Sequence, residues 1–266
     1  MKIGNQICIS RLDKMGDMIL SLPAIKAIKI ANPNIKITIL ASKENTELLK
    51  ELDYIDNFIF IDTHINFYNF LKKIFIVRKQ KYDLFLNLSP TLLSYVYCFF
   101  SKAEKKGTLI FLSRYRKTFF SKLIIRLLSK LYCHYVYVIN RYYLLKNDKE
   151  IHQTKMIFNL IKMCNISFDS NTNINISLPK HKLNITSANK SLVTIHLSNK
   201  WINKYYSEEN FFDLIAKLPT KKYTYVLTTD DYTNHKFRKI YKRFQIISNN
   251  KLHKINLLDR NFTIFD

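Results

Sequence analysis

The order of apolar and polar positions along the chain predicts alternating strands and helices. Short apolar runs typical of strands occur at residues 7–10, 36–41, 58–61, 83–88, 105–111, 192–196, 223–228 and 245–247. Apolar residues at helical spacing fill residues 19–31, 43–52, 67–79, 91–101, 115–132, 151–164, 207–218 and 232–244, and a loop is expected after residue 196. Because strands and helices alternate, we expect an α/β fold with parallel sheets and right-handed crossovers.

The chain is predicted to contain two Rossmann-like lobes with a cleft between them. Residues 166–190 are rich in Asn, Ser and Thr and contain Pro179, a composition typical of a linker. They separate an N-terminal lobe, residues 1–165, from a C-terminal lobe, residues 191–266. The second lobe holds only two or three strand–helix steps, so we expect it to be incomplete.

Residues 11–23 connect the first predicted strand to the first helix and carry the first candidate chemistry. Gly16 is one of only three glycines, and we expect it in a tight turn where a side chain would be in the way. Asp17 follows at the carboxyl end of the strand, where open α/β sheets bind ligands, and the positive end of the helix favours its ionised form. It can serve as a base, bind a ligand, or simply cap the helix.

The net charge of +23 indicates attraction to an anionic partner, such as a phosphorylated lipid, a membrane surface or nucleic acid. Biased composition is an equal explanation, because Lys, Asn, Ile, Tyr and Phe are abundant, as AT-rich coding would give. Residues 115–132 predict a basic amphipathic helix, which either lies on an anionic membrane or covers the core. No apolar run reaches the ~18 residues of a membrane span.

The four cysteines, Cys8, Cys98, Cys133 and Cys164, lack the spacing of metal ligands. Cys8 and Cys98 lie in apolar runs, so we expect reduced core thiols and a cytoplasmic protein. The first residues also lack the pattern of a signal peptide.

Four segments taken together resemble glycosyltransferase family 9, the heptosyltransferase-type enzymes of the two-lobed GT-B fold. The first is residues 11–23, with Gly16, Asp17 and Pro23 in order. The second is residues 82–88, followed by Gly107. The third is His152 with the helix after it, and the fourth is residues 196–211, where a lysine precedes an aromatic residue and a helix.

The resemblance implies a transferase that moves a heptose-like sugar from a nucleotide diphosphate sugar to a lipopolysaccharide-type or other lipid-linked glycan. The reaction would be inverting and metal-independent, with no cofactor besides the donor substrate. Asp17 matches the family's catalytic carboxylate and would act as general base on the acceptor hydroxyl. Lys204 matches the lysine that contacts the donor phosphates, and Ser198 and Asn199 could donate hydrogen bonds to the same phosphates.

On the acceptor side, Arg11 and Lys14 could meet phosphates of an anionic glycan. The resemblance implies work at the inner face of the cytoplasmic membrane, with possible peripheral contact. We expect no nucleic-acid partner, because the sequence contains no Gly-rich RNA motif and no zinc pattern.

The chain departs from the family pattern in places. The family has glycine at the positions of Asp13 and Ser198, and Trp-Pro at those of Tyr206 and Ser207. Its later Asp-Ser-Gly-x-x-His signature, which belongs to the donor pocket, has no counterpart. The alternative is therefore a catalytically inactive, truncated relative that binds anionic glycolipid or nucleotide.

Three residues of the fourth segment also have purely structural interpretations. His196 is expected to be packed or hydrogen-bonded, and Trp201, the single tryptophan, to anchor a loop instead of stacking on a ligand. Lys204 by itself would be an ordinary surface lysine, and its place before an aromatic residue and a helix makes the phosphate role equally plausible.

Overall fold

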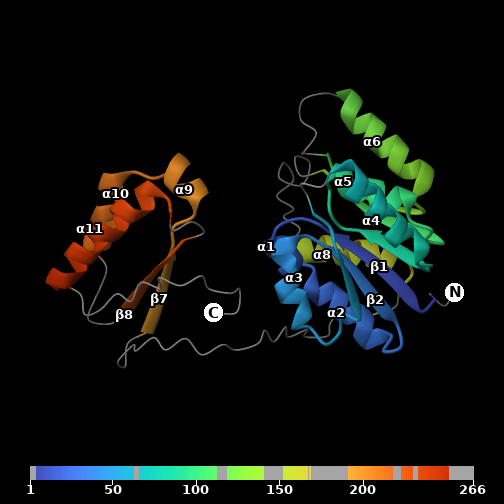
Figure 1. Ribbon diagram of the computed structural model, residues 1–266, viewed down its shortest axis with the longest axis horizontal. Helices are drawn as coiled ribbons and strands as arrows, with labels where there is room; N and C mark the ends of the chain where they lie inside the picture. Colours follow the sequence, from blue (N-terminus) through green and yellow to red (C-terminus); the bar gives the residue numbers. More distant parts are fainter. Residues whose placement is uncertain are drawn as a thin grey trace. The chain divides into compact units, whose positions relative to one another are not determined.

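The computed structural model describes residues 4–62, 66–112, 119–140, 152–166, 168, 191–217, 223–229 and 233–251. The chain divides into two compact units, Met1–Pro179 and Lys180–Asp266, which are described separately (Figure 1). The predicted linker, residues 166–190, lies outside the described residues except for 166 and 168.

The described part of the first unit contains a six-stranded parallel sheet in the order β3-β2-β1-β4-β5-β6. The strands are β1 (Gln6–Arg11), β2 (Lys36–Ala41), β3 (Asn57–Phe60), β4 (Leu84–Asn87), β5 (Lys105–Phe111) and β6 (Tyr135–Ile139). β1 lies in the middle, where Ile9 pairs with Ile39 of β2 on one side and Leu86 of β4 on the other. The strand order changes direction between β1 and β4, so the carboxyl end of β1 is a topological switch point.

Helices cover both faces of this sheet (Figure 1). They are α1 (Met15–Ile19), α2 (Leu22–Ala31), α3 (Lys43–Lys50), α4 (Phe67–Lys79), α5 (Leu92–Phe100), α6 (Phe119–Tyr132) and α8 (Gln153–Met163). α2 packs against α8, and α4 packs against α5. Because right-handed crossovers that step in opposite directions place their helices on opposite faces, α2 and α3 lie on one face and α4, α5 and α6 on the other.

The central strands are buried on both sides, which explains why their sequences read as continuous apolar runs. Ile7, Cys8, Ile9 and Phe85 are fully buried. All four cysteines of the chain are buried and free, as expected.

Gly107 in β5 allows α8 to pack closely on the sheet. A Cβ atom at this position would lie 3.0 Å from the Sγ atom of Cys164 and 3.1 Å from a methyl carbon of Leu86. The glycine therefore favours this close packing, since a Cβ atom here would require Cys164 or Leu86 to shift by a few tenths of an ångström.

The second unit has a smaller sheet in which β7 (Ser191–His196) and β8 (Tyr223–Thr228) pair in parallel. Its described helices are α9 (Asn199–Lys204), α10 (Glu208–Lys217) and α11 (His235–Lys251). They enclose a small core of buried side chains: Leu197, Ile202, Phe211, Phe212, Leu227, Phe237 and Ile240. The α/β fold with parallel sheets, predicted from the alternation of elements, is confirmed.

Three local predictions differ from the structure. The predicted strand at residues 245–247 belongs to α11, because apolar positions 237, 240, 244 and 247 keep helical spacing throughout. The expected loop after β7 contains the short helix α9. β6 was not predicted. Among the described residues it pairs on one side only, with β5, and most of its side chains are half-buried.

Candidate functional site

Asp17 lies in α1, directly beyond the carboxyl end of β1. The N-cap of α1 is Lys14, whose side chain makes no capping bond, and Asp17 is the third residue of the helix. Asp17 is therefore not the N-cap of the helix, which was the purely structural role considered for it. The Asp17 side chain is 32% exposed, so solvent and a ligand can both reach it.

Two side chains from distant parts of the chain hold one oxygen of this carboxylate. The amide nitrogen of Gln153, the first residue of α8, donates to Oδ1 of Asp17 at 3.0 Å. A guanidinium nitrogen of Arg11 lies 3.5 Å from the same Oδ1. The other oxygen, Oδ2, accepts no hydrogen bond from the described residues, which leaves it available to a bound hydroxyl.

Arg11 takes a different place from the one predicted. Its side chain is 0% exposed, and it donates through Nε to the backbone oxygen of Asp17 at 3.0 Å. One terminal nitrogen donates to Asp13 Oδ2 at 3.2 Å and to the backbone oxygen of Leu88 at the end of β4. A guanidinium enclosed in this way does not reach an acceptor phosphate, so the acceptor contact expected of Arg11 is replaced by a positioning role. Lys14, by contrast, is exposed.

The expected steric reason for Gly16 is also absent. Gly16 is an exposed residue of α1 with no positive φ, and a Cβ atom built on it would meet no protein atom within 4 Å. Gly16 is therefore a helix residue and not a turn glycine. The space that a side chain at position 16 would enter is open.

A buried polar network lies beneath this loop, and sequence reasoning missed it. Ser10 and Ser94 share a hydrogen bond of 2.5 Å, and Ser94 donates to Asn87 at 2.5 Å. Ser89 accepts from the backbone N–H of Leu12 at 2.7 Å. These side chains join the carboxyl ends of β1 and β4 to the start of α5. Polar residues at the end of the apolar run 83–88 were the available signal.

In the second unit, two of the three predicted donor-binding residues shape the start of α9. Ser198 is the N-cap, and its hydroxyl oxygen accepts from the backbone N–H of Trp201 at 3.2 Å. The amide oxygen of Asn199 accepts from the side chain of Asn234, which itself caps α11. Lys204 is exposed in the last turn of α9, with its ammonium 5.4 Å from the ring centroid of Tyr205.

His196 and Trp201 both make contacts within their own unit. Nδ1 of His196 lies 3.0 Å from the hydroxyl of Thr228 on the neighbouring strand. The ring of Trp201 packs edge-on against Tyr206 and Phe211, with centroid distances of 5.4 and 5.9 Å. Trp201 thus anchors α9 to the core of its own unit.

No protein-family model matches the sequence, and no curated protein matches it either. Solved structures do match. The glycosyl transferase family 9 structure from Veillonella parvula superposes with a TM-score of 0.68 and 16% identity, covering 99% of this chain and 71% of that one. The E. coli heptosyltransferase WaaC with ADP superposes with a TM-score of 0.65 and 14% identity, covering 97% of this chain and 76% of that one. E. coli ADP-heptose lps heptosyltransferase II superposes with a TM-score of 0.58 and 13% identity, covering 90% of this chain and 68% of that one.

The chain has the fold of the family 9 glycosyltransferases. The resemblance seen in four sequence segments is thereby confirmed as a likeness of fold. Within this family 9 fold, the Asp17 carboxylate lies at the switch point of the first sheet, the place where α/β sheets bind ligands.

Asp17 offers a carboxylate that is 32% exposed and whose Oδ2 accepts no hydrogen bond from the described residues. Carboxylates are among the side chains that can accept a proton as a general base. Among the described residues, no group of three His, Cys, Asp or Glu side chains lies close enough together to hold a metal ion.

Proposed function

We propose that the chain is a glycosyltransferase that moves a sugar from a nucleotide diphosphate sugar to an acceptor hydroxyl, with Asp17 as general base. The observation that carries the proposal is the Asp17 carboxylate at the switch point of a family 9 fold, held through Oδ1, while Oδ2 accepts no hydrogen bond from the part of the chain that the structure describes. The structural neighbours support the donor class, since one is a heptosyltransferase with bound ADP and another is an ADP-heptose transferase.

In the proposed reaction, the acceptor oxygen attacks the anomeric carbon while the bond from that carbon to the diphosphate breaks. The proton of the acceptor hydroxyl passes to Oδ2 of Asp17. Because this is a single displacement, the configuration at the anomeric carbon inverts. Gln153 and Arg11 hold the carboxylate through Oδ1, and Oδ2 is the oxygen proposed to receive the proton.

On the donor side, we propose that the exposed ammonium of Lys204 binds the diphosphate. A cation at this position offsets the negative charge that grows on the leaving group, so the proposed reaction needs no metal ion. Ser198 and Asn199 lie at the carboxyl end of β7 and are proposed to contribute further contacts to the same phosphates.

For the acceptor, we propose a lipid-linked glycan of the lipopolysaccharide type, reached at the inner face of the cytoplasmic membrane. Lys14 is exposed three residues before Asp17 and is the proposed contact for an acceptor phosphate. Arg11 is not included, because it is buried.

The test is transfer from ADP-heptose, and from other nucleotide sugars, to a lipid A–core acceptor. Asp17→Asn is expected to abolish transfer while ADP still binds, because only the proton acceptor is lost. Asp53→Asn, an exposed carboxylate on the surface, is the matched control and should transfer normally. Unchanged transfer by Asp17→Asn would remove Asp17 from the mechanism.

A second candidate is a catalytically inactive relative that binds nucleotide or anionic glycolipid. It is favoured by the departures from the family pattern at Asp13, Ser198 and Tyr206. Calorimetry that shows ADP binding, together with no transfer to any acceptor by the unaltered chain, would support it.

A further inference from the structure

Some apolar side chains of helix α4 pack on the protein, and others beside them are exposed. Phe70, Ile74 and Val77 face the core of the first unit. Phe67 and Phe75 lie eight residues apart along the edge of this packed face, and they are 74% and 71% exposed. Leu71 lies between them, one helical turn from each, so the three form an exposed apolar row. An exposed row of this kind marks an interaction surface more often than chance exposure.

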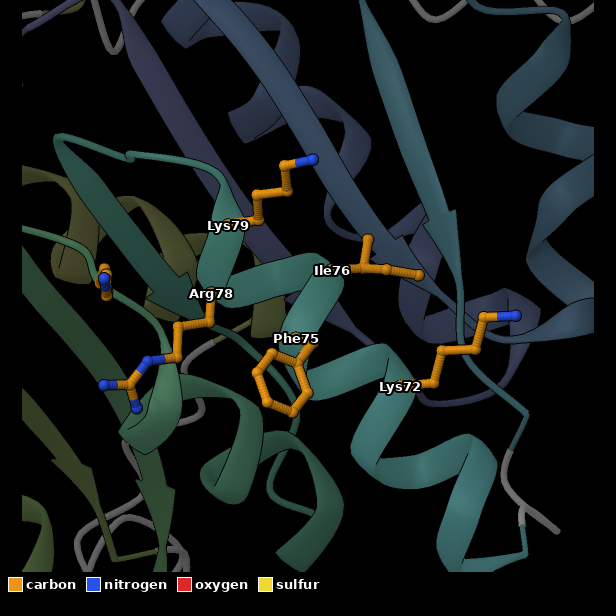
Figure 2. A pocket seen from close by; sticks show the side chains of 6 residues that line it. Lys72, Phe75, Ile76, Arg78 and Lys79 are labelled. Atoms are coloured by element: carbon orange, nitrogen blue, oxygen red, sulfur yellow. The ribbon is translucent and has the colours of Figure 1, made fainter.

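A basic hollow adjoins this row. Its volume is about 420 Å³, and it is lined by Lys72, Phe75, Ile76, Arg78, Lys79 and Lys102. Figure 2 shows Phe75 on α4 between Lys72 and Arg78. No carboxylate of the described residues forms an ion pair with any of these four cations. The positive charge is therefore available to an outside partner.

The neighbouring helices α5 and α6 also combine exposed apolar side chains with a lack of acidic residues. Neither α4, α5 nor α6 contains an Asp or Glu residue. Large apolar side chains are exposed on α5 and on the described end of α6, namely Leu92, Phe99, Phe100, Leu127, Leu128 and Leu131. All three helices lie on the same face of the first sheet (Figure 1). We define the α4 surface as Phe67, Leu71, Phe75 and the four cations of the hollow.

We propose that the α4 surface docks on a bilayer that contains anionic phospholipids. The row of Phe67, Leu71 and Phe75 enters the boundary between headgroups and acyl chains, where aromatic and aliphatic side chains gain burial. The cations of the hollow meet the lipid phosphates, while their aliphatic stems lie along the apolar row. Attachment is peripheral, since none of the described helices has the length and apolar character that crossing a bilayer requires.

A bilayer fits this surface better than nucleic acid does. Nucleic-acid surfaces combine cations with aromatic rings that stack on bases, but they have little use for exposed aliphatic side chains. Here Leu71 and the leucines of α5 and α6 are exposed among the cations. Anionic lipid supplies both the negative charge and the apolar phase that such a mixture needs. The proposal goes beyond the transfer reaction and does not depend on it.

The experiment is flotation of the full chain with phosphatidylcholine vesicles, with and without phosphatidylglycerol. We expect binding only to the vesicles that contain phosphatidylglycerol. Lys72→Gln/Lys79→Gln should weaken binding roughly 25-fold, at about 1 kcal/mol per cation near an anionic surface. Phe75→Ser should weaken it as well, because the apolar contact is lost. The matched controls are Lys43→Gln/Lys50→Gln and Ile30→Ser, which change exposed residues of α3 and α2 on the other face.

If the control variants lost vesicle binding to the same extent, the proposal would be overturned, since binding would then come from the net charge of the whole chain. Absence of vesicle binding would overturn it too. The proposal would also be overturned if Lys72, Lys79 and Phe75 were needed for binding a thymidine oligonucleotide, or for self-association, while the chain did not bind vesicles. Far-UV circular dichroism checks that each variant is folded. Asp17→Asn should bind vesicles like the unaltered chain, so failure of docking and failure of transfer are separable.

Discussion

Gln153 donates its side-chain amide to Oδ1 of Asp17 at 3.0 Å, although 136 residues separate the two along the chain. Gln153 begins α8, and Asp17 belongs to α1, so the contact ties the last described helix of the first unit to the end of its first strand. The hydroxyl of Thr154 adds a bond of 2.9 Å to the backbone oxygen of Leu20. The start of α8 therefore determines where the carboxylate points.

The first prediction follows from this contact. Gln153→Ala should lower kcat for sugar transfer about 10-fold, roughly the loss of one hydrogen bond to a charged group at the low end of its range, ~1.5 kcal/mol. KM for the donor should stay the same, because Gln153 acts on Asp17 and not on the nucleotide. Asn159→Ala is the matched control, since Asn159 lies on the same helix and donates to Tyr137 instead. A variant that raises KM without changing kcat would contradict the positioning role.

Arg11 gives the second prediction. Arg11→Met should lower the free energy of unfolding by roughly 3 kcal/mol, because it leaves the carboxylate of Asp13 buried without its cation. Urea unfolding measures the change. Arg126→Met, at an exposed position on α6, should change stability by less than about 0.5 kcal/mol. If Arg11→Met and Arg126→Met change the free energy of unfolding by the same amount, the buried guanidinium does not stabilise the connection between β1 and α1.

Two glycines give the third prediction as a matched pair. Gly107→Ala places a methyl group 3.0 Å from the Sγ atom of Cys164, so the variant should lose about 1–3 kcal/mol of stability. Gly16→Ala meets nothing within 4 Å and should leave stability unchanged or raise it by up to about 1 kcal/mol, since alanine favours a helix.

The Gly16→Ala variant also tests whether the acceptor uses the open space at position 16: in that case transfer should be slower, because the added methyl group fills part of it. Thermal unfolding and the transfer assay together separate the two effects. Normal transfer by this variant would show that the acceptor does not use that space.

The fourth prediction concerns pH. Burial tends to raise the pKa of Asp56, but the backbone N–H of Ile37 at 2.7 Å and the ammonium of Lys29 at 2.9 Å hold it below its usual range. Asp56 therefore adds stability above its unfolded pKa of about 4, and this contribution is lost as the pH falls through the lower folded pKa.

Asp56→Asn should accordingly be less stable than the unaltered chain near neutral pH, with the difference shrinking in acid. Urea unfolding at several pH values checks this, with Asp53→Asn as the control at an exposed carboxylate. A difference that stays constant down to the acid limit would contradict the assigned pKa.

Much of the fold could be predicted from the sequence because the signal is local. The apolar runs at residues 7–10 and 83–88 are long enough to fill a strand that is buried on both faces. The predicted strand at 245–247 was wrong because three residues are too few to show whether apolar positions follow the spacing of a strand or of a helix. The spacing over all of α11 shows the helix.

The candidate site divides in the same way. Sequence order alone placed Asp17 at the carboxyl end of the first strand, since a strand followed by a helix always brings that junction to one edge of the sheet. The burial of Arg11 against Leu88, and the contact between Asp17 and Gln153, were decided only by the tertiary structure. The physical reason is distance along the chain. Apolar periodicity records which face of an element is buried, but the partner of a polar side chain depends on which distant segment packs against it.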